Sequence, residues 1–252
     1  MRRFLIALLL ILPFAAVPQA HALNVSGEKI IFPVIGRFPG AGGTQWQTDV
    51  FIANPGTANY VLTLRYYPSG GEPVQVHTIN VTTPFTTITL TDICLNTFGR
   101  TNTGGMLEID GGVFTPEARA RIYNVGNPAG QFGQGVPGIG LGRLSRQAFL
   151  YGLSTTSANR LNIGVANPND TPVLVSIFVN DHNGTNITTR SVTVQPHSFV
   201  QYNDIAAAFG VPPQEGLVVN MNSSGELIYG YASEVRNDTG DAVFTFGVSP
   251  NS

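Results

Sequence analysis

The chain has 252 residues, of which 42% are hydrophobic and only 11% are charged, with a formal net charge of −2. This apolar content can bury enough surface to offset chain entropy, so we expect a folded protein. The near-neutral charge excludes the basic footprint that binding to nucleic acid or to an anionic membrane surface requires. At roughly 100–200 residues per domain, the length fits one or two domains.

The first 22 residues have the pattern of a secretory signal peptide. Arg2 and Arg3 precede an apolar run, and small residues at positions 20 and 22 suit a signal peptidase. Pro13 interrupts the run, which falls short of the ~20 apolar residues that span a bilayer. We therefore expect cleavage after Ala22 and a secreted, periplasmic or cell-surface protein. Its mature chain has 11 basic and 15 acidic residues, a net charge of −4, and should not insert into a membrane.

Cys94 is the single cysteine of the chain. One cysteine cannot form an intramolecular disulfide, so the fold needs its own hydrophobic core. Cys94 lies within the apolar segment 90–95, which predicts a buried small hydrophobe rather than a reactive thiol.

An internal repeat organises the mature chain. Ala53-Asn54-Pro55 recurs as Ala166-Asn167-Pro168, an offset of 113 residues. At the same offset, apolar positions alternate with a period of two on both sides of this corner, which predicts strands with one buried face. The aligned positions are Thr48, Val50, Ile52, Tyr60, Leu62, Leu64 and Tyr66 with Leu161, Ile163, Val165, Val173, Val175, Ile177 and Val179.

A short helical turn follows in each copy. Asp92 aligns with Asp204, and Gly99 aligns with Gly210. In the second copy we expect a helix that begins at Asn203 or Asp204 as N-cap and stops at Gly210. The first copy keeps the same aspartate and glycine, so a helical turn is expected there too.

The shared order of elements predicts an all-β protein of two tandem antiparallel immunoglobulin-like β-sandwich modules, each with a short helical turn. A closed antiparallel sheet would show similar spacing, whereas a parallel sheet is disfavoured because no βαβ rhythm exists. The expected organisation is signal peptide 1–22, module 23–125, Gly-rich linker 126–145 and module 146–252. Phe132 and Val136 suggest that part of the linker packs on a module.

Four segments, 40–56, 119–124, 130–137 and 160–167, together resemble a group of uncharacterised bacterial secreted proteins with paired immunoglobulin-like modules. The likeness spans most of the mature chain and implies export and architecture, but no activity. The second copy has Arg160-Leu161-Asn162 where the first has Gln47-Thr48-Asp49.

No residue pattern indicates catalysis, a metal or a cofactor. His77 lies in an alternating strand, His182 in a turn with Asp181, and His197 directly before Ser198. Adjacent strand residues point to opposite faces, so a triad of Ser198, His197 and Asp204 would not assemble. The Gly-rich segment lacks the Lys-Ser/Thr ending of a phosphate loop.

One charged constellation can be placed from the sequence. Glu108 and Asp110 alternate with apolar residues, as do Arg119 and Arg121, and a Gly-rich turn lies between them. We expect both pairs on the solvent faces of neighbouring strands, where they form cross-strand ion pairs. The competing hypothesis is an anion or glycan platform of Arg119 and Arg121 completed by Tyr123.

These observations favour a non-enzymatic secreted or surface module that binds a protein or a glycan, or serves as a structural spacer. The alternative is a secreted hydrolase with a site between the modules.

Overall fold

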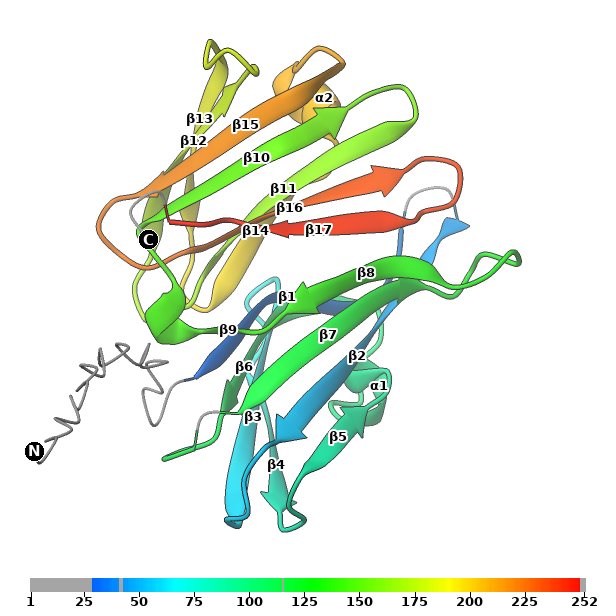
Figure 1. Ribbon diagram of the computed structural model, residues 1–252, viewed down its shortest axis with the longest axis vertical. Coiled ribbons are helices and arrows are strands. Elements are labelled where there is room, and N and C mark those ends of the chain that lie inside the picture. The colour runs from blue at the N-terminus through cyan, green and yellow to red at the C-terminus, as the bar shows by residue number, and fades with distance from the viewer. Residues whose placement is uncertain (1–28, 41–42, 115, 250–252) are drawn as a thin grey trace, which may run out of the picture.

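The computed structural model describes residues 29–40, 43–114 and 116–249. The chain is nearly all β, and its antiparallel strands form two sandwich modules that lie one above the other in Figure 1, which confirms the predicted fold class. The predicted signal peptide and its cleavage site at Ala22 lie outside the described residues. Within the described ranges, no helix has the length and apolar character needed to cross a bilayer.

The first module has nine strands and one short helix. Its strands follow the order β4-β3-β6-β1-β2-β7-β8, with β5 on β2 and β9 on β1. The end of β1 pairs with the start of β2, so β1 connects two layers. Its elements are β1 (Ile30–Pro39), β2 (Gln45–Asn54), β3 (Tyr60–Pro68), β4 (Gln75–Val81), β5 (Thr86–Leu90), α1 (Ile93–Asn96), β6 (Thr103–Asp110), β7 (Glu117–Asn124), β8 (Phe132–Pro137) and β9 (Ile139–Gly140).

The second module begins after the 3-10 turn η2 (Leu141–Arg143). Its two four-stranded sheets have the orders β10-β15-β12-β13 and β14-β11-β16-β17. Its elements are β10 (Gln147–Thr155), β11 (Asn159–Asn167), β12 (Val173–Asn180), β13 (Asn186–Val194), β14 (Ser198–Tyr202), α2 (Ile205–Phe209), β15 (Gln214–Ser223), β16 (Tyr229–Arg236) and β17 (Ala242–Phe246).

The two modules share one topology. Each strand from β1 to β8 has a counterpart from β10 to β17 in the same sheet order, and α1 corresponds to α2, but the pairing of β1 with β2 has no equivalent between β10 and β11. The pairs β11–β14 and β12–β15 match the B–E and C–F pairs of an immunoglobulin sandwich. The outer strands differ from those of an immunoglobulin sandwich, in which the first strand pairs with B and the last strand pairs with F. Here the first strand, β10, pairs with β15, and β16 pairs with β11.

The alternating positions of the repeat form the cores as predicted. Val50 and Ile52 of β2 are fully buried in the core of the first module. Ile163 and Val165 of β11 are fully buried in the core of the second. Cys94 is also fully buried, which confirms its predicted role as a core residue.

Both repeated corners have a structural reason. Asn54 and Asn167 are buried, and their side-chain amides donate to backbone carbonyls, Asn54 to Thr83 and Asn167 to Thr171.

Asp204 starts α2 as its N-cap and accepts from the Ala206 backbone N–H, while Gly210 ends the helix with a φ of 71°, as expected. Backbone N–H groups of Asp92 and Asp204 donate to the side chains of the aligned residues Asp49 and Asn162, at 2.8 and 2.9 Å.

The Gly-rich segment 126–145 differs from the expected irregular linker. It contains β8, β9 and η2, and β8 pairs with β7 along its whole length from Arg119↔Pro137 to Asn124↔Phe132. The first module therefore takes its edge strand from this segment. The outer limits of the modules stay predictions.

The modules are docked through the outer face of the sheet β14-β11-β16-β17. Tyr229 and Tyr231 of β16 are buried in the same cluster as the core of the first module. Tyr229 Oη donates to the Pro137 carbonyl at 2.9 Å, and Ser233 Oγ donates to Gln134 Oε1 at 2.7 Å. Figure 1 shows β17 and β8 side by side at this junction.

Candidate functional site: the outer face of β7 and β8

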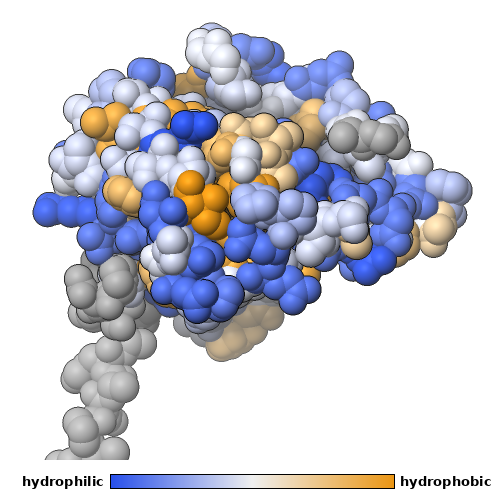
Figure 2. Space-filling model, turned by 90° about the horizontal axis from the view of Figure 1, so that it is seen from above, coloured by the Kyte–Doolittle hydropathy of each residue, from blue (hydrophilic) through white to orange (hydrophobic). Residues whose placement is uncertain are grey.

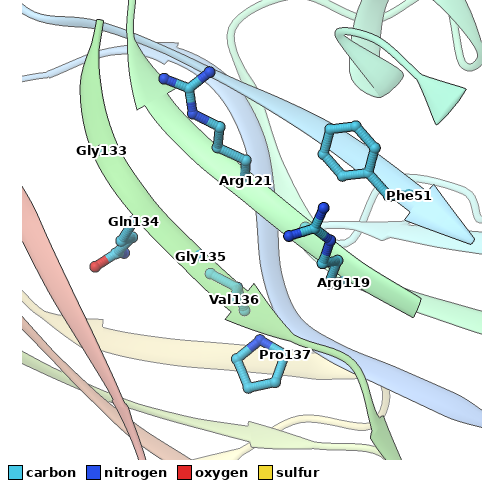
Figure 3. Close-up of a pocket in the computed structure, with 9 residues that line it drawn as sticks. Phe51, Arg119, Arg121, Gly133, Gln134, Gly135, Val136 and Pro137 are labelled. Atoms are coloured by element: carbon cyan, nitrogen blue, oxygen red, sulfur yellow. The ribbon is translucent and has the colours of Figure 1, made fainter. Parts of the chain in front are cut away.

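The most distinctive charged site among the described residues is a hollow on the outer face of the first module. It measures about 340 Å³ and is lined mainly by β7 and β8, with Phe51 contributed by β2. Figure 3 shows Arg119 and Arg121 side by side on β7, with the ring of Phe51 beside them and the backbone of β8 opposite. Because alternate residues of a strand share a face, both predicted arginines project to the same side.

Each guanidinium lies over an aromatic ring. The Arg119 guanidinium carbon is 5.1 Å from the centre of the Phe51 ring, and that of Arg121 is 4.3 Å from the centre of the Tyr123 ring. Such cation–π contacts are worth about 0.5–1 kcal/mol at exposed sites. Arg121 also donates to the side chain and carbonyl of Gln131, at 3.5 and 3.3 Å. The contacts hold both cations in place without neutralising them.

Neither arginine forms an ion pair with a carboxylate in the part of the chain that the structure describes. Their positive charges therefore remain available to a ligand.

Glycines of β8 keep the hollow open. Gly135 lies opposite Arg121 and Gly133 lies opposite Tyr123 in the β7–β8 register. A Cβ added at Gly135 would meet nothing within 4 Å, whereas one at Gly133 would lie 2.2 Å from the Ile122 carbonyl oxygen. Gly133 thus permits close strand approach, and Gly135 leaves space beside the arginines.

Tyr123 does not complete the platform as an exposed ring. It is only 5% exposed, beneath the Arg121 guanidinium, and its hydroxyl accepts from Gln47 Nε2. Burial raises the pKa of Tyr123, and the nearby Asp49 carboxylate raises it further. Tyr123 therefore acts as a neutral support for Arg121.

The expected ion pairs between Glu108 or Asp110 and the two arginines are wrong. Strand β6 pairs with β1 and β3, whereas β7 pairs with β2 and β8, so the connection after Asp110 crosses between layers. Glu108 is buried instead against Arg65 and Lys29, at 2.8 and 3.2 Å. The glycines after Asp110 favour a hairpin between β6 and β7. The two strands instead lie in different layers, whose apolar faces pack on each other across one core.

The histidines lie apart from this hollow. His197 Nε2 contacts Asp170 Oδ1 at 2.8 Å, and its ring stacks on Tyr67 of the first module with centroids 4.4 Å apart. Asp181 accepts from the backbone of Asn183 and Thr185, which makes the His182 segment a tight turn. No cluster of three metal-ligating His, Cys, Asp or Glu side chains occurs among the described residues.

A second hollow lies at the edge of the module junction. It measures about 230 Å³, and its described lining includes one carboxylate, Asp238. That carboxylate forms two hydrogen bonds with Arg236, at 2.8 and 3.0 Å. General acid–base hydrolysis usually needs two carboxylates or a nucleophile with its base, and this lining offers neither.

No protein-family model and no curated protein matches the chain. Among solved structures, Thermotoga maritima 1070 aligns with a TM-score of 0.35 and 14% identity, over 41% of this chain and 92% of that one. A glycosyl hydrolase family 2 member from Bacteroides cellulosilyticus aligns at 0.17 and 9%, over 92% of this chain and 30% of that one. For a calcium-binding mutant of Bacteroides uniformis β-glucuronidase 2 the values are 0.16, 8%, 88% and 32%.

The chain spans about a third of the length of these two glycosidases. Similarities this weak carry no conclusion about activity. The sandwich architecture rests on the strand arrangement of the chain itself. The resemblance to exported bacterial proteins stays a prediction.

Proposed function

We propose that the protein is a secreted or cell-surface binding module without catalytic activity, and that the outer face of β7 and β8 binds an acidic glycan. The observation that carries this proposal is the pair of arginines, held over aromatic rings and without a carboxylate partner, beside a hollow that glycines keep open. The predicted signal peptide supports an extracytoplasmic location.

The chemistry of the hollow suits a carboxylate or sulfate on a sugar ring. Guanidinium groups donate paired hydrogen bonds to planar anions, and this geometry gives specificity as well as affinity. The half-buried Phe51 ring offers an apolar surface for the C–H face of a sugar beside Arg119. A nucleic acid would need a broader basic surface than two arginines on an acidic chain.

The test is binding of the mature chain, residues 23–252, to polygalacturonate and to a sulfated polysaccharide by affinity electrophoresis. Hydrogen bonds to charged groups contribute about 1.5–3 kcal/mol each, so R119Q/R121Q should weaken binding by about ten-fold or more. Binding should also fall as salt is raised, because the site is partly exposed.

R143Q/R146Q is the matched control, since it removes two exposed arginines elsewhere and changes the net charge equally. Equal losses in both variants would show attraction to overall charge and contradict the assigned site. Failure of the native chain to bind either polymer would also reject the proposal.

A further inference from the structure

A second, chemically different surface lies on the outer face of the sheet β10-β15-β12-β13. Figure 2 looks down on the second module from the top of Figure 1 and shows apolar side chains gathered among hydrophilic ones. An open hollow of about 460 Å³ lies on this sheet and has no ionisable lining residue. It is lined by Phe178, Asn180, Asn186, Thr189, Asn220 and Asn222.

The equivalent positions of the first module are occupied by a charge network. One row across the sheet reads Phe149, Asn220, Phe178, Thr189 in the second module and Ile31, Glu108, Arg65, Val76 in the first. In the first module, the Glu108 carboxylate is satisfied by Arg65 and Lys29. In the second, an aromatic ring replaces the arginine and an amide replaces the carboxylate.

This replacement leaves hydrogen-bond acceptors without partners. The Oδ1 atoms of Asn220 and Asn222 are shielded from solvent and have no hydrogen-bond partner, although Asn180 and Asn186 bond to each other at 3.0 Å. An unsatisfied buried acceptor costs stability, so native proteins seldom keep one. Both residues line the hollow, and the torsion that orients a side-chain amide is soft, so each amide can turn to meet a bound hydroxyl.

We propose that this face binds a neutral polysaccharide. Sugars offer hydroxyl donors for Asn220 and Asn222 and an apolar C–H face for the Phe178 ring, and the absence of charge in the hollow matches an uncharged ligand. On β10, Phe149 and the exposed Tyr151 extend the aromatic surface, with ring centroids 6.0 Å apart. The site is independent of Arg119 and Arg121 and lies on the other module.

The experiment is affinity electrophoresis of the mature chain in gels that contain hydroxyethyl cellulose, xyloglucan, xylan or galactomannan. Retardation in at least one gel is expected. F178A and N220A should each weaken that binding by about ten-fold, because each removes a principal contact. F178Y, which keeps the ring, should bind within a few-fold of the native chain.

The controls separate this site from the acidic-glycan site. V76A changes the exposed position of the first module that corresponds to Thr189 of the hollow, and it should bind as the native chain does. R119Q/R121Q should also leave neutral binding unchanged, and circular dichroism must show that F178A and N220A are folded. Lack of retardation in all four gels, or retention of binding in folded F178A and N220A, overturns the proposal. A face that binds a protein partner instead of a polysaccharide would give the first of these results.

Discussion

Buried isoleucines in the two copies should contribute similarly to stability. Ile52 of β2 and Ile163 of β11 lie on the alternating core faces of corresponding strands and are fully buried in separate cores. Truncation to alanine leaves a cavity as well as lost transfer energy, so I52A and I163A should each lower the free energy of unfolding by about 2–5 kcal/mol. Urea unfolding measures this, with the half-exposed Val61 as control in V61A. A loss below about 0.5 kcal/mol would contradict the assigned core positions.

Cys94 should be chemically silent in the native protein. Burial raises the pKa of its thiol to about 12, with a smaller contribution from the Asp92 carboxylate. Thiol reagents attack the thiolate, which is scarce near pH 8 when the pKa is that high. We expect no labelling of the native chain by a disulfide reagent at pH 8 and one thiol labelled in denaturant. Rapid native labelling would show that the residue is accessible.

At this scale, sequence reasoning identifies core residues better than charge partners. The alternation around Ile52 and Ile163 reflects local strand geometry, which is visible in the chain itself. The partner of Glu108 depends on which strands share a sheet, and Arg65 is 43 residues away. The sequence indicates the two arginines of the hollow, but the glycines beside them favour a linker rather than the strand β8 that they form.

At the scale of elements, β8 shows why a glycine-rich strand is difficult to predict from the sequence. Phe132, Gln134 and Val136 alternate with Gly133, Gly135 and Pro137, so one face carries side chains and the other almost none. The sequence of this segment alternates with a period of two, but its glycine content favours a loop. Pairing with β7 supplies the stability that strand propensity lacks.

The two glycines of β8 should respond oppositely to substitution. G133A places a Cβ against the Ile122 carbonyl and Tyr123 and should cost about 1–3 kcal/mol by overpacking. G135A meets open space and should be neutral or slightly stabilising, because it reduces the freedom of the unfolded chain. Thermal unfolding of the pair checks this. Equal effects would mean that the β7–β8 register is misassigned.

At the scale of the whole molecule, the repeat predicts two sandwiches but not their docking. Strand β16 is buried on both faces, since Ala232 packs in the core of the second module, whereas Tyr229 and Tyr231 pack on the first module. A strand that serves a core and an interface loses the polar alternation by which an outer face is recognised. The repeat predicts two modules joined by a linker, whereas the structure shows an apolar cluster that both modules share.

Docking of the modules can be tested at Gly164 of β11, which lies under Tyr231. A Cβ at this position would lie 2.3 Å from Tyr231 Cζ, so a larger side chain must displace the ring that packs on the first module. Gly164 alternates with the core residues Ile163 and Val165, so its Cβ would point to the interface rather than into the core of the second module. G164V should therefore lower the thermal midpoint and expose the segment between β8 and β10 to limited proteolysis.

T78V is the control for G164V, since it places an equally branched side chain on the exposed face of β4, away from the junction. It should change the midpoint little, because exposed substitutions are usually within about 0.5 kcal/mol. If docking couples the modules, the native chain unfolds in one transition and G164V separates it into two. Two transitions already in the native chain would show that the shared cluster contributes little, because each module then unfolds independently.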